Sequence, residues 1–191
     1  MTRIIAGAAK GHRLRVPAGS DTRPTSDRVR EALFSRLEHD GWLDQTRVLD
    51  LYAGSGALGL EAASRGATAV LLVEQARPAA AVIEQNVRAT RLPGVTVAVG
   101  DVPRVLARPA GHRASATEPF DLALLDPPYP LDDADLAAVL ALLTDGGWLA
   151  ERAMVVVERH RRSPQPAWPH TLVAVGERGY GETRLWFAER G

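Results

Sequence analysis

Asp50-Leu51-Tyr52-Ala53-Gly54-Ser55-Gly56-Ala57-Leu58-Gly59 joins a predicted strand, Val48–Tyr52, to a predicted helix, Ala57–Arg65. Its glycines fit the pattern G-x-G-x-x-G, which permits a tight turn and lets a cofactor come close to the backbone. Sites for NAD, FAD and S-adenosylmethionine share this pattern. We therefore expect a cofactor site at this turn, and other residues must distinguish among the three cofactors.

Alternating strands and helices surround this turn. The predicted strands are near-continuous apolar runs: Val48–Tyr52, Ala69–Val73, Val95–Val99, Phe120–Leu125 and Met154–Glu158. Such runs are typical of a parallel sheet with helices on both faces.

The end of the chain has a different pattern. Thr171–Val175 and Thr183–Ala188 flank the segment Gly176–Gly181, which predicts an antiparallel hairpin. The predicted fold class is α/β, a Rossmann-like doubly wound sheet that is mostly parallel and ends in this hairpin.

The start of the chain predicts a small hairpin and helix extension. Arg3-Ile4-Ile5 and His12–Val16 are β-prone and are separated by glycine-containing turn residues. A helix is expected from Asp27 to about Glu38, with Thr25 or Ser26 as its cap. We place the domain boundary here, giving an extension at 1–38 and a main domain at 39–191.

Composition excludes several classes of protein. The chain has 191 residues, of which 46% are hydrophobic, and it has no cysteine. Disulfides, thiolate metal sites and cysteine nucleophiles are therefore excluded, and the histidines show no metal-binding spacing. No apolar run approaches the roughly 18 residues of a membrane span, and Met1–Arg15 lacks the apolar segment of a signal peptide. We expect a cytoplasmic protein with no metal and no membrane partner.

The charge is unevenly distributed. Lys+Arg 23 and Asp+Glu 23 cancel, which at face value argues against a nucleic-acid binder. However, Met1–Arg30 carries a formal charge of +5, whereas Asp121–Ala150 contains six acids and no Lys or Arg. Arginine dominates the positive charge, which suits phosphate contacts and is equally typical of a GC-rich genome.

An acidic residue lies at the carboxyl end of each of the first four predicted strands: Asp50, Glu74, Asp101 and Asp126. Ligands of open α/β sheets bind at the carboxyl ends of the strands. Glu74 lies at the right distance from the glycines to bind ribose hydroxyls. A carboxylate at Asp50 repels a pyrophosphate and accepts hydrogen bonds from a cationic amino-acid group, which favours S-adenosylmethionine over NAD. Asp101 either binds the adenine amine or caps the following helix.

Asp126-Pro127-Pro128-Tyr129 predicts the chemistry. The prolines fix a rigid turn and leave their carbonyls without local amide partners. A carboxylate and a proline carbonyl then form paired acceptors for an amine, while Tyr129 stacks on an extruded base. The alternative is a strand-terminating turn with an incidental core tyrosine.

These motifs resemble those of class I, S-adenosylmethionine-dependent amino-methyltransferases. Arg3–Gly7, Lys10–Leu14, Arg23-Pro24-Thr25 and Asp27–Phe34 are similar to the N-terminal signature of the bacterial 16S rRNA guanine-N2 methyltransferase family, RsmD. The resemblance implies methylation of one guanine in 16S rRNA, within assembled 30S particles or late intermediates. It also implies a seven-stranded sheet and a monomer.

The resemblance also implies residue roles. The catalytic residues would be Asp126, Pro127 and Tyr129. The cofactor-binding residues would be Asp50, Ala53, Gly54, Gly56, Glu74, Asp101 and Thr25. We assign RNA contacts to Arg3, Lys10, Arg13, Arg15, Arg23 and Arg28, for which the alternative is solvated surface charge.

Other functions remain possible from the residues alone. An NAD-dependent oxidoreductase would use the same glycine-rich loop, although Asp50 and the Asp-Pro-Pro-Tyr turn oppose it. A DNA adenine-N6 methyltransferase would use the same chemistry, and only the N-terminal resemblance argues against it. Glutamine methyltransferases typically have Asn at the position of Asp126. A non-enzymatic nucleic-acid-binding module is disfavoured by the complete set of acidic strand ends.

Overall fold

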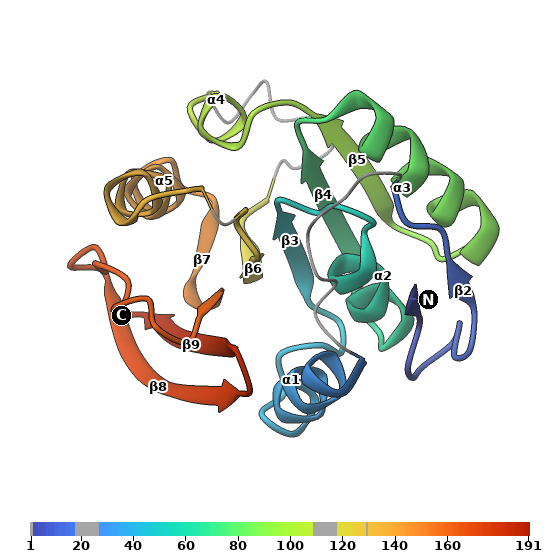
Figure 1. Ribbon diagram of the computed structural model, residues 1–191, viewed down its shortest axis with the longest axis horizontal. Coiled ribbons are helices and arrows are strands. Elements are labelled where there is room, and N and C mark those ends of the chain that lie inside the picture. The colour runs from blue at the N-terminus through green and yellow to red at the C-terminus, as the bar shows by residue number, and fades with distance from the viewer. Residues whose placement is uncertain (1, 18–26, 109–117, 129) are drawn as a thin grey trace.

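Seven strands form the central sheet of the computed structural model, which describes residues 2–17, 27–108, 118–128 and 130–191. The strand order is β5-β4-β3-β6-β7-β9-β8 (Figure 1). The strands are β3 (Arg47–Leu51), β4 (Ala69–Glu74), β5 (Val95–Val99), β6 (Phe120–Leu125), β7 (Leu149–His160), β8 (Leu172–Tyr180) and β9 (Thr183–Arg190). β3 to β7 pair in parallel, whereas β9 runs antiparallel to both β7 and β8. The predicted fold class is confirmed.

Helices cover both faces of the sheet (Figure 1). α1 (Asp27–His39), α2 (Ala57–Ser64) and α3 (Arg77–Thr90) pack on one face, and α4 (Val102–Leu106) and α5 (Asp133–Asp145) pack on the other. Alternate strand residues belong to opposite faces; Val48 packs with α1 and α2, and Leu49 packs with α4 and α5. This alternation explains why the strands are apolar throughout. In the described ranges, no helix has the length and apolar character to span a membrane.

The C-terminal hairpin has longer strands than the sequence predicted. β8 continues past a bulge between Ala174 and Gly176 and ends at Tyr180, which pairs with Thr183. The turn therefore lies at residues 181–182, and the predicted antiparallel hairpin is confirmed with a longer first strand. Glycine is tolerated inside the strand because Gly176 occupies the bulge, where φ is 151°.

The predicted N-terminal hairpin is present, although each strand is short. β1 (Thr2–Arg3) pairs antiparallel with β2 (Arg13–Leu14). Ile4 and Leu14 are buried against Leu60 of α2. The hairpin therefore shares an apolar contact with the helix that begins at the glycine-rich turn.

Buried polar side chains of α2 form hydrogen bonds with the loop that connects the two hairpin strands. The carboxylate of Glu61, which is fully buried, accepts hydrogen bonds from the backbone N–H of Ile5 at 2.7 Å and of Ala6 at 3.0 Å. The hydroxyl of Ser64 donates to the carbonyl of Ala6 and accepts from the N–H of Ala9. Because a buried carboxylate is costly without partners, these bonds fix the hairpin on α2.

We predict that Gly7→Ala destabilises the protein. Gly7 has φ of 78°, and an added Cβ would lie 1.8 Å from the carbonyl oxygen of Ser64. Backbone strain and displacement of the hairpin together should lower the free energy of unfolding by about 2–4 kcal/mol. Urea denaturation measures the change.

Gly11→Ala is the matched control, because Gly11 has φ of 82° and open space around an added Cβ. It should show the backbone strain alone, about 1 kcal/mol. Equal losses in the two variants would contradict the close contact with Ser64.

Candidate active site

The glycine-rich loop and the loop that begins at Asp126 leave the sheet side by side, from two residues that lie opposite each other on neighbouring strands. Leu51 of β3 lies opposite Leu125 of β6 in the parallel ladder. The glycine-rich loop follows Leu51, and Asp126 follows Leu125. Because β4 and β6 flank β3 on opposite sides, the winding of the chain reverses at this point. Ligands of doubly wound sheets bind in the crevice at such a reversal.

Glycines shape the first loop. Gly54 and Gly56 have φ of 57° and 79°, which L side chains rarely adopt. Gly59 sits in α2 where it crosses the sheet, and a Cβ there would lie 2.3 Å from Leu72. Gly54 and Gly56 therefore allow the tight turn that the sequence pattern predicted, and Gly59 allows the close packing of α2 on the sheet. Ala53, also assigned to the cofactor, is buried and donates from its N–H to the carbonyl of Val73 at 3.0 Å.

Asp50 is a buried carboxyl beneath this loop. It is 1% exposed, and its Oδ2 accepts a hydrogen bond from the N–H of Gly59 at 2.8 Å. Its Oδ1 has no hydrogen-bond partner in the described part of the chain. Burial raises the pKa of Asp50 to about 7; the Gly59 bond opposes this effect and the charge of Glu74 adds to it. A buried acceptor without a donor fits the cationic amino group of S-adenosylmethionine, directly or through water.

Glu74 at the end of β4 contacts the same loop. Its Oε2 accepts from the N–H of Gly54 at 2.9 Å, and its Oε1 accepts from the N–H of Ala76 at 2.7 Å. Each carboxylate oxygen has a second lone pair, so these bonds are compatible with ribose hydroxyls as further donors. The structure thus brings Glu74 beside Gly54 of the glycine-rich loop.

Asp101 stands at the N-terminus of α4. Its side chain makes no capping hydrogen bond to that helix. The capping role, which the sequence left open, is therefore not the one observed. The preceding residue, Gly100, donates from its N–H to the carbonyl of Glu74 at 2.9 Å, so Asp101 lies next to the end of β4.

Sequence reasoning missed Tyr52 as a site residue. It occupies the loop after β3 with φ of 65°, an unusual conformation for an aromatic residue. Its hydroxyl is buried and has no partner within the described residues. Burial, followed by the charges of Asp101 and Asp135, raises the pKa of Tyr52 to about 12, so the phenol stays protonated as a donor. The signal was available in the sequence, since Tyr52 lies between Asp50 and Gly54.

The loop that begins at Asp126 differs from its prediction in the hydrogen bonding of one proline carbonyl. Asp126 is partly buried and Pro127 is buried. The carbonyl of Pro128 accepts a hydrogen bond from the N–H of Leu131 at 2.9 Å, so the expectation that both proline carbonyls lack local amide partners was wrong. The turn after the prolines brings that donor back. Tyr129 lies outside the described residues, as do Thr25 and Arg23.

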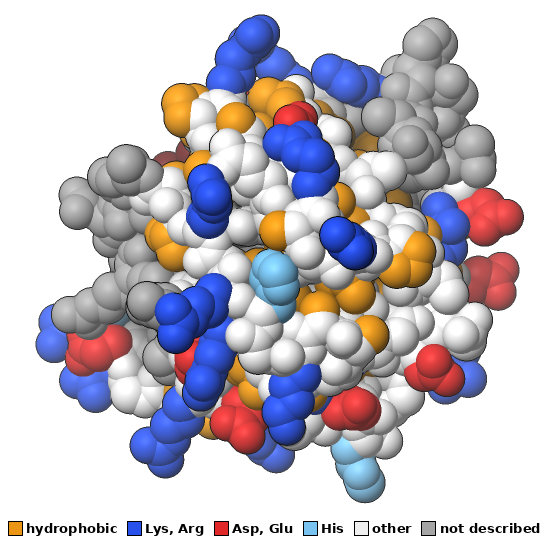
Figure 2. Space-filling view, turned by 90° about the vertical axis from the view of Figure 1, so that its right-hand side faces the viewer, with side chains coloured by type: hydrophobic (Ala, Val, Ile, Leu, Met, Phe, Trp, Pro, Cys, Tyr) orange, Lys and Arg blue, Asp and Glu red, His pale blue; other side chains and the backbone are white. Residues whose placement is uncertain are grey.

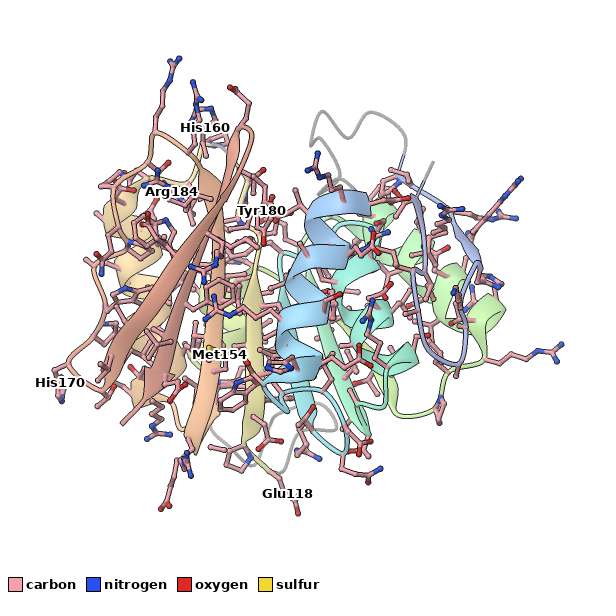
Figure 3. The ribbon with its side chains drawn as sticks, turned by 90° about the horizontal axis from the view of Figure 1, so that it is seen from below. Glu118, Met154, His160, His170, Tyr180 and Arg184 are labelled. Atoms are coloured by element: carbon pink, nitrogen blue, oxygen red, sulfur yellow. The ribbon has the colours of Figure 1, made fainter. Side chains whose placement is uncertain are left out.

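Arg159 anchors the segment that follows the Asp126 loop through two hydrogen bonds. This residue was not identified from the sequence. Its guanidinium donates to the carbonyl of Leu131 at 3.0 Å and to the carboxylate of Asp133 at 2.8 Å. Arg159 lies at the end of β7, next to His160 at the upper edge of the molecule in Figure 3, whereas Glu118 marks the opposite edge. The sequence predicted that this strand ends at Glu158. Because β7 continues to His160, Arg159 lies at the end of the strand, beside the loop that follows β6.

The residues assigned to RNA contacts are exposed where the structure describes them. Lys10, Arg13 and Arg15 project from or beside the hairpin, and Arg28 projects from α1. Arg3 is exposed as well and lies 3.6 Å from the carboxylate of Asp27. The structure therefore brings Arg3, Lys10, Arg13 and Arg15 together on one hairpin, and Arg3 contacts the start of α1, the helix that carries Arg28.

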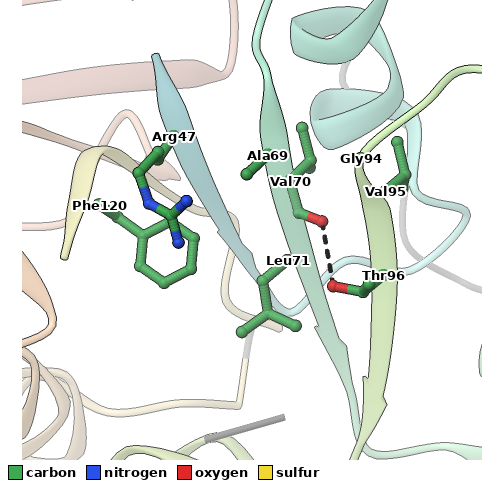
Figure 4. A pocket seen from close by; sticks show the side chains of 8 residues that line it. All are labelled: Arg47, Ala69, Val70, Leu71, Gly94, Val95, Thr96 and Phe120. Carbon is green, nitrogen blue, oxygen red and sulfur yellow. Dashed lines mark hydrogen bonds between the residues drawn. The ribbon is translucent and has the colours of Figure 1, made fainter. Parts of the chain in front are cut away.

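A hollow of about 340 Å³ lies at the opposite, amino edge of the sheet (Figure 4). The starts of β3 to β6 line it, and the guanidinium of Arg47 lies 5.5 Å from the centre of the Phe120 ring. None of the site residues predicted from the sequence lines it. No cluster of three or more potential metal ligands occurs among the described residues.

We predict that Asp50 makes stability depend on pH. Its folded pKa of about 7 lies above the ordinary value of 3.8, so the folded state binds the proton more tightly than the unfolded state. Stability therefore falls as pH rises from about 4 to 7, by about 2–4 kcal/mol relative to Asp50→Asn, which does not titrate.

The measurement is the free energy of unfolding of both proteins across this pH range. The difference between them should change with pH and level off above about pH 8. A constant difference would show that Asp50 has an ordinary pKa.

Comparison with known proteins identifies the family. The family model described as Conserved hypothetical protein 95 matches residues 2–189. Ribosomal RNA small subunit methyltransferase D of Escherichia coli K12 is 36% identical over 167 residues, which cover 87% of this chain and 79% of that protein. The protein of the same name from Haemophilus influenzae is 34% identical, covering 85% of this chain and 80% of its own length.

A solved structure supports the same relationship. A hypothetical protein of Thermus thermophilus is 35% identical, with a TM-score of 0.82 over 99% of both chains. The chain therefore belongs to the RsmD family of bacterial methyltransferases, the family whose model is described as Conserved hypothetical protein 95.

Proposed function

We propose that this protein transfers a methyl group from S-adenosylmethionine to the exocyclic N2 amine of a guanine in 16S rRNA. The observation that carries the proposal is the opposition of Leu51 and Leu125, from which the cofactor loop and the Asp126 loop both begin. The relatives named small-subunit rRNA methyltransferase D support rRNA as the substrate.

The cofactor loop holds the ligand through groups already described. When bound, S-adenosylmethionine supplies an electrophilic methyl group on a sulfonium. Asp50 accepts from the amino-acid end, Glu74 binds the ribose and Asp101 binds the adenine amine. The residues that hold the cofactor would be Asp50, Ala53, Gly54, Gly56, Glu74, Asp101 and Thr25.

Asp126 and the carbonyl of Pro127 act on the amine. The lone pair of guanine N2 is delocalised into the ring, so the amine is a poor nucleophile. Two acceptors for its two hydrogens favour a pyramidal nitrogen and stabilise the positive charge that develops during attack. No base is needed before attack, and the departing proton passes to the Asp126 carboxylate or to water. Tyr129 stacks on the extruded base.

The extension at 1–38 would bind RNA, and the domain at 39–191 would carry the reaction. Exposed Arg and Lys on the hairpin suit phosphate contacts, which position a substrate without reading its sequence. A monomer acting on assembled or late-assembly 30S subunits, in the cytoplasm, fits this division of roles.

Methyl transfer to three substrates tests the proposal. Purified 30S particles, naked 16S rRNA and duplex DNA are incubated with labelled S-adenosylmethionine, and the nucleosides are then separated. We expect N2-methylguanine from 30S particles. N6-methyladenine from DNA would support a DNA methyltransferase instead. Calorimetry that detects NAD binding and no S-adenosylmethionine binding would support the oxidoreductase.

Asp126→Ala should lower kcat by at least about 100-fold, because the amine loses its charged acceptor. Cofactor affinity should change little, since Asp126 belongs to the substrate loop. Single-turnover methylation and calorimetry with S-adenosylmethionine measure the two effects. A variant that retains full turnover would remove Asp126 from the catalytic role.

Arg13→Ala combined with Arg15→Ala should weaken binding to 30S particles. Each lost phosphate contact should reduce the slope of log K against log salt concentration by about 1. Binding is measured over a salt series, with circular dichroism as a control for folding. An unchanged slope would place the hairpin outside the RNA interface.

A further inference from the structure

A basic hollow lies where the N-terminal hairpin meets α3. It has a volume of about 500 Å³ and is lined by Arg15, Gln85, Arg88 and Ala89. Figure 2 views the molecule from this side; blue side chains are spread over the face from top to bottom, and red ones lie mostly along its lower part and margins. The hollow contains no aromatic lining that would hold a base, and its guanidinium groups suit a phosphate.

Arg15 is held in place before any ligand binds. Asn86 of α3 accepts from the N–H of Arg15 and donates to its carbonyl, both at 2.9 Å. Gln85 accepts a hydrogen bond from Nη1 of Arg15 at 3.0 Å. Backbone and side chain are thus both fixed, which lowers the entropy lost when the guanidinium binds an anion.

The same amide connects the hollow to the cofactor loop. Asn86 is 2% exposed, and its Nδ2 also donates to the carbonyl of Ser55 at 2.9 Å. Ser55 stands between the two glycines of the loop. A group bound at Arg15 is therefore positioned relative to the cofactor loop through one buried side chain.

Arg88 supplies the second cation. Its side chain is 68% exposed and lies 3.7 Å from Glu84, one helical turn earlier. Glu84 is the only acid of α3, whereas Arg77 at the start of that helix and Arg91 just beyond it are also exposed. An exposed pair of this kind is weak, so a phosphate can replace Glu84 as the partner of Arg88.

We propose that Arg15 and Arg88 bind one backbone phosphate of the RNA substrate, and that α3 is a second RNA-binding element beside the hairpin. This inference rests on the proposed function and extends it, because Arg88 had no assigned role. The competing carboxylate of Glu84 gives the proposal a distinctive consequence, since its removal should strengthen RNA binding.

The test compares three variants in binding to 30S particles over a salt series. Arg88→Gln should bind about 10-fold more weakly at low salt and reduce the salt slope by about 1. Glu84→Gln should bind more tightly than the wild type, because Arg88 is freed. Arg152→Gln is the matched control, since Arg152 is exposed on β7 toward the amino edge of the sheet and should leave both quantities unchanged.

The outcomes separate this proposal from the proposed function. If the wild type methylates 30S particles and Arg88→Gln behaves as Arg152→Gln does, the phosphate site is overturned and the function stands. If Glu84→Gln weakens binding, the site is also overturned. If the wild type neither binds nor methylates 30S particles, the proposed function fails, and this proposal fails with it.

Discussion

The hydrogen bond from the Gly59 N–H to the buried carboxyl of Asp50 is the contact on which the rest of the site depends. It requires α2 to pack so closely on the sheet that no Cβ fits at position 59. That packing sets where α2 begins, and therefore the path of the glycine-rich loop. Oδ1 of Asp50 is buried beneath that loop without a partner among the described residues, so the carboxyl can accept a further donor there.

The extension and the cofactor loop share one scaffold. α2 starts at the loop and holds the hairpin through Glu61 and Ser64. α3 reaches both the loop and the hairpin through Asn86. The N-terminal hairpin is therefore fixed to the two helices that contact the glycine-rich loop. If the hairpin binds substrate as proposed, short and buried polar bonds hold its contacts in register with the glycine-rich loop.

Sequence patterns predicted the parallel strands and the glycine-rich turn because both are local. Apolar runs and glycine spacing are direct consequences of burial on two faces and of positive φ. Long-range partners were not predictable in this way. Glu61 and Asn86 are polar residues inside helices, and they reveal their role only when the hairpin folds back over 55 or more residues. The role of Arg159 could not be predicted for the same reason, because it contacts Leu131, which lies 28 residues earlier in the chain.

The bonds of Asn86 have a consequence for how this surface can evolve. Within the described part of the chain, Oδ1 and Nδ2 of Asn86 bond only to backbone atoms of Arg15 and Ser55. Aspartate lacks the donors, leucine lacks every polar group and glutamine is one methylene longer, so position 86 tolerates little change. Position 15, in contrast, can exchange its side chain without losing its anchor. The hairpin is thus attached through backbone atoms, so the exposed side chain at position 15 can change in evolution while the hairpin keeps its place.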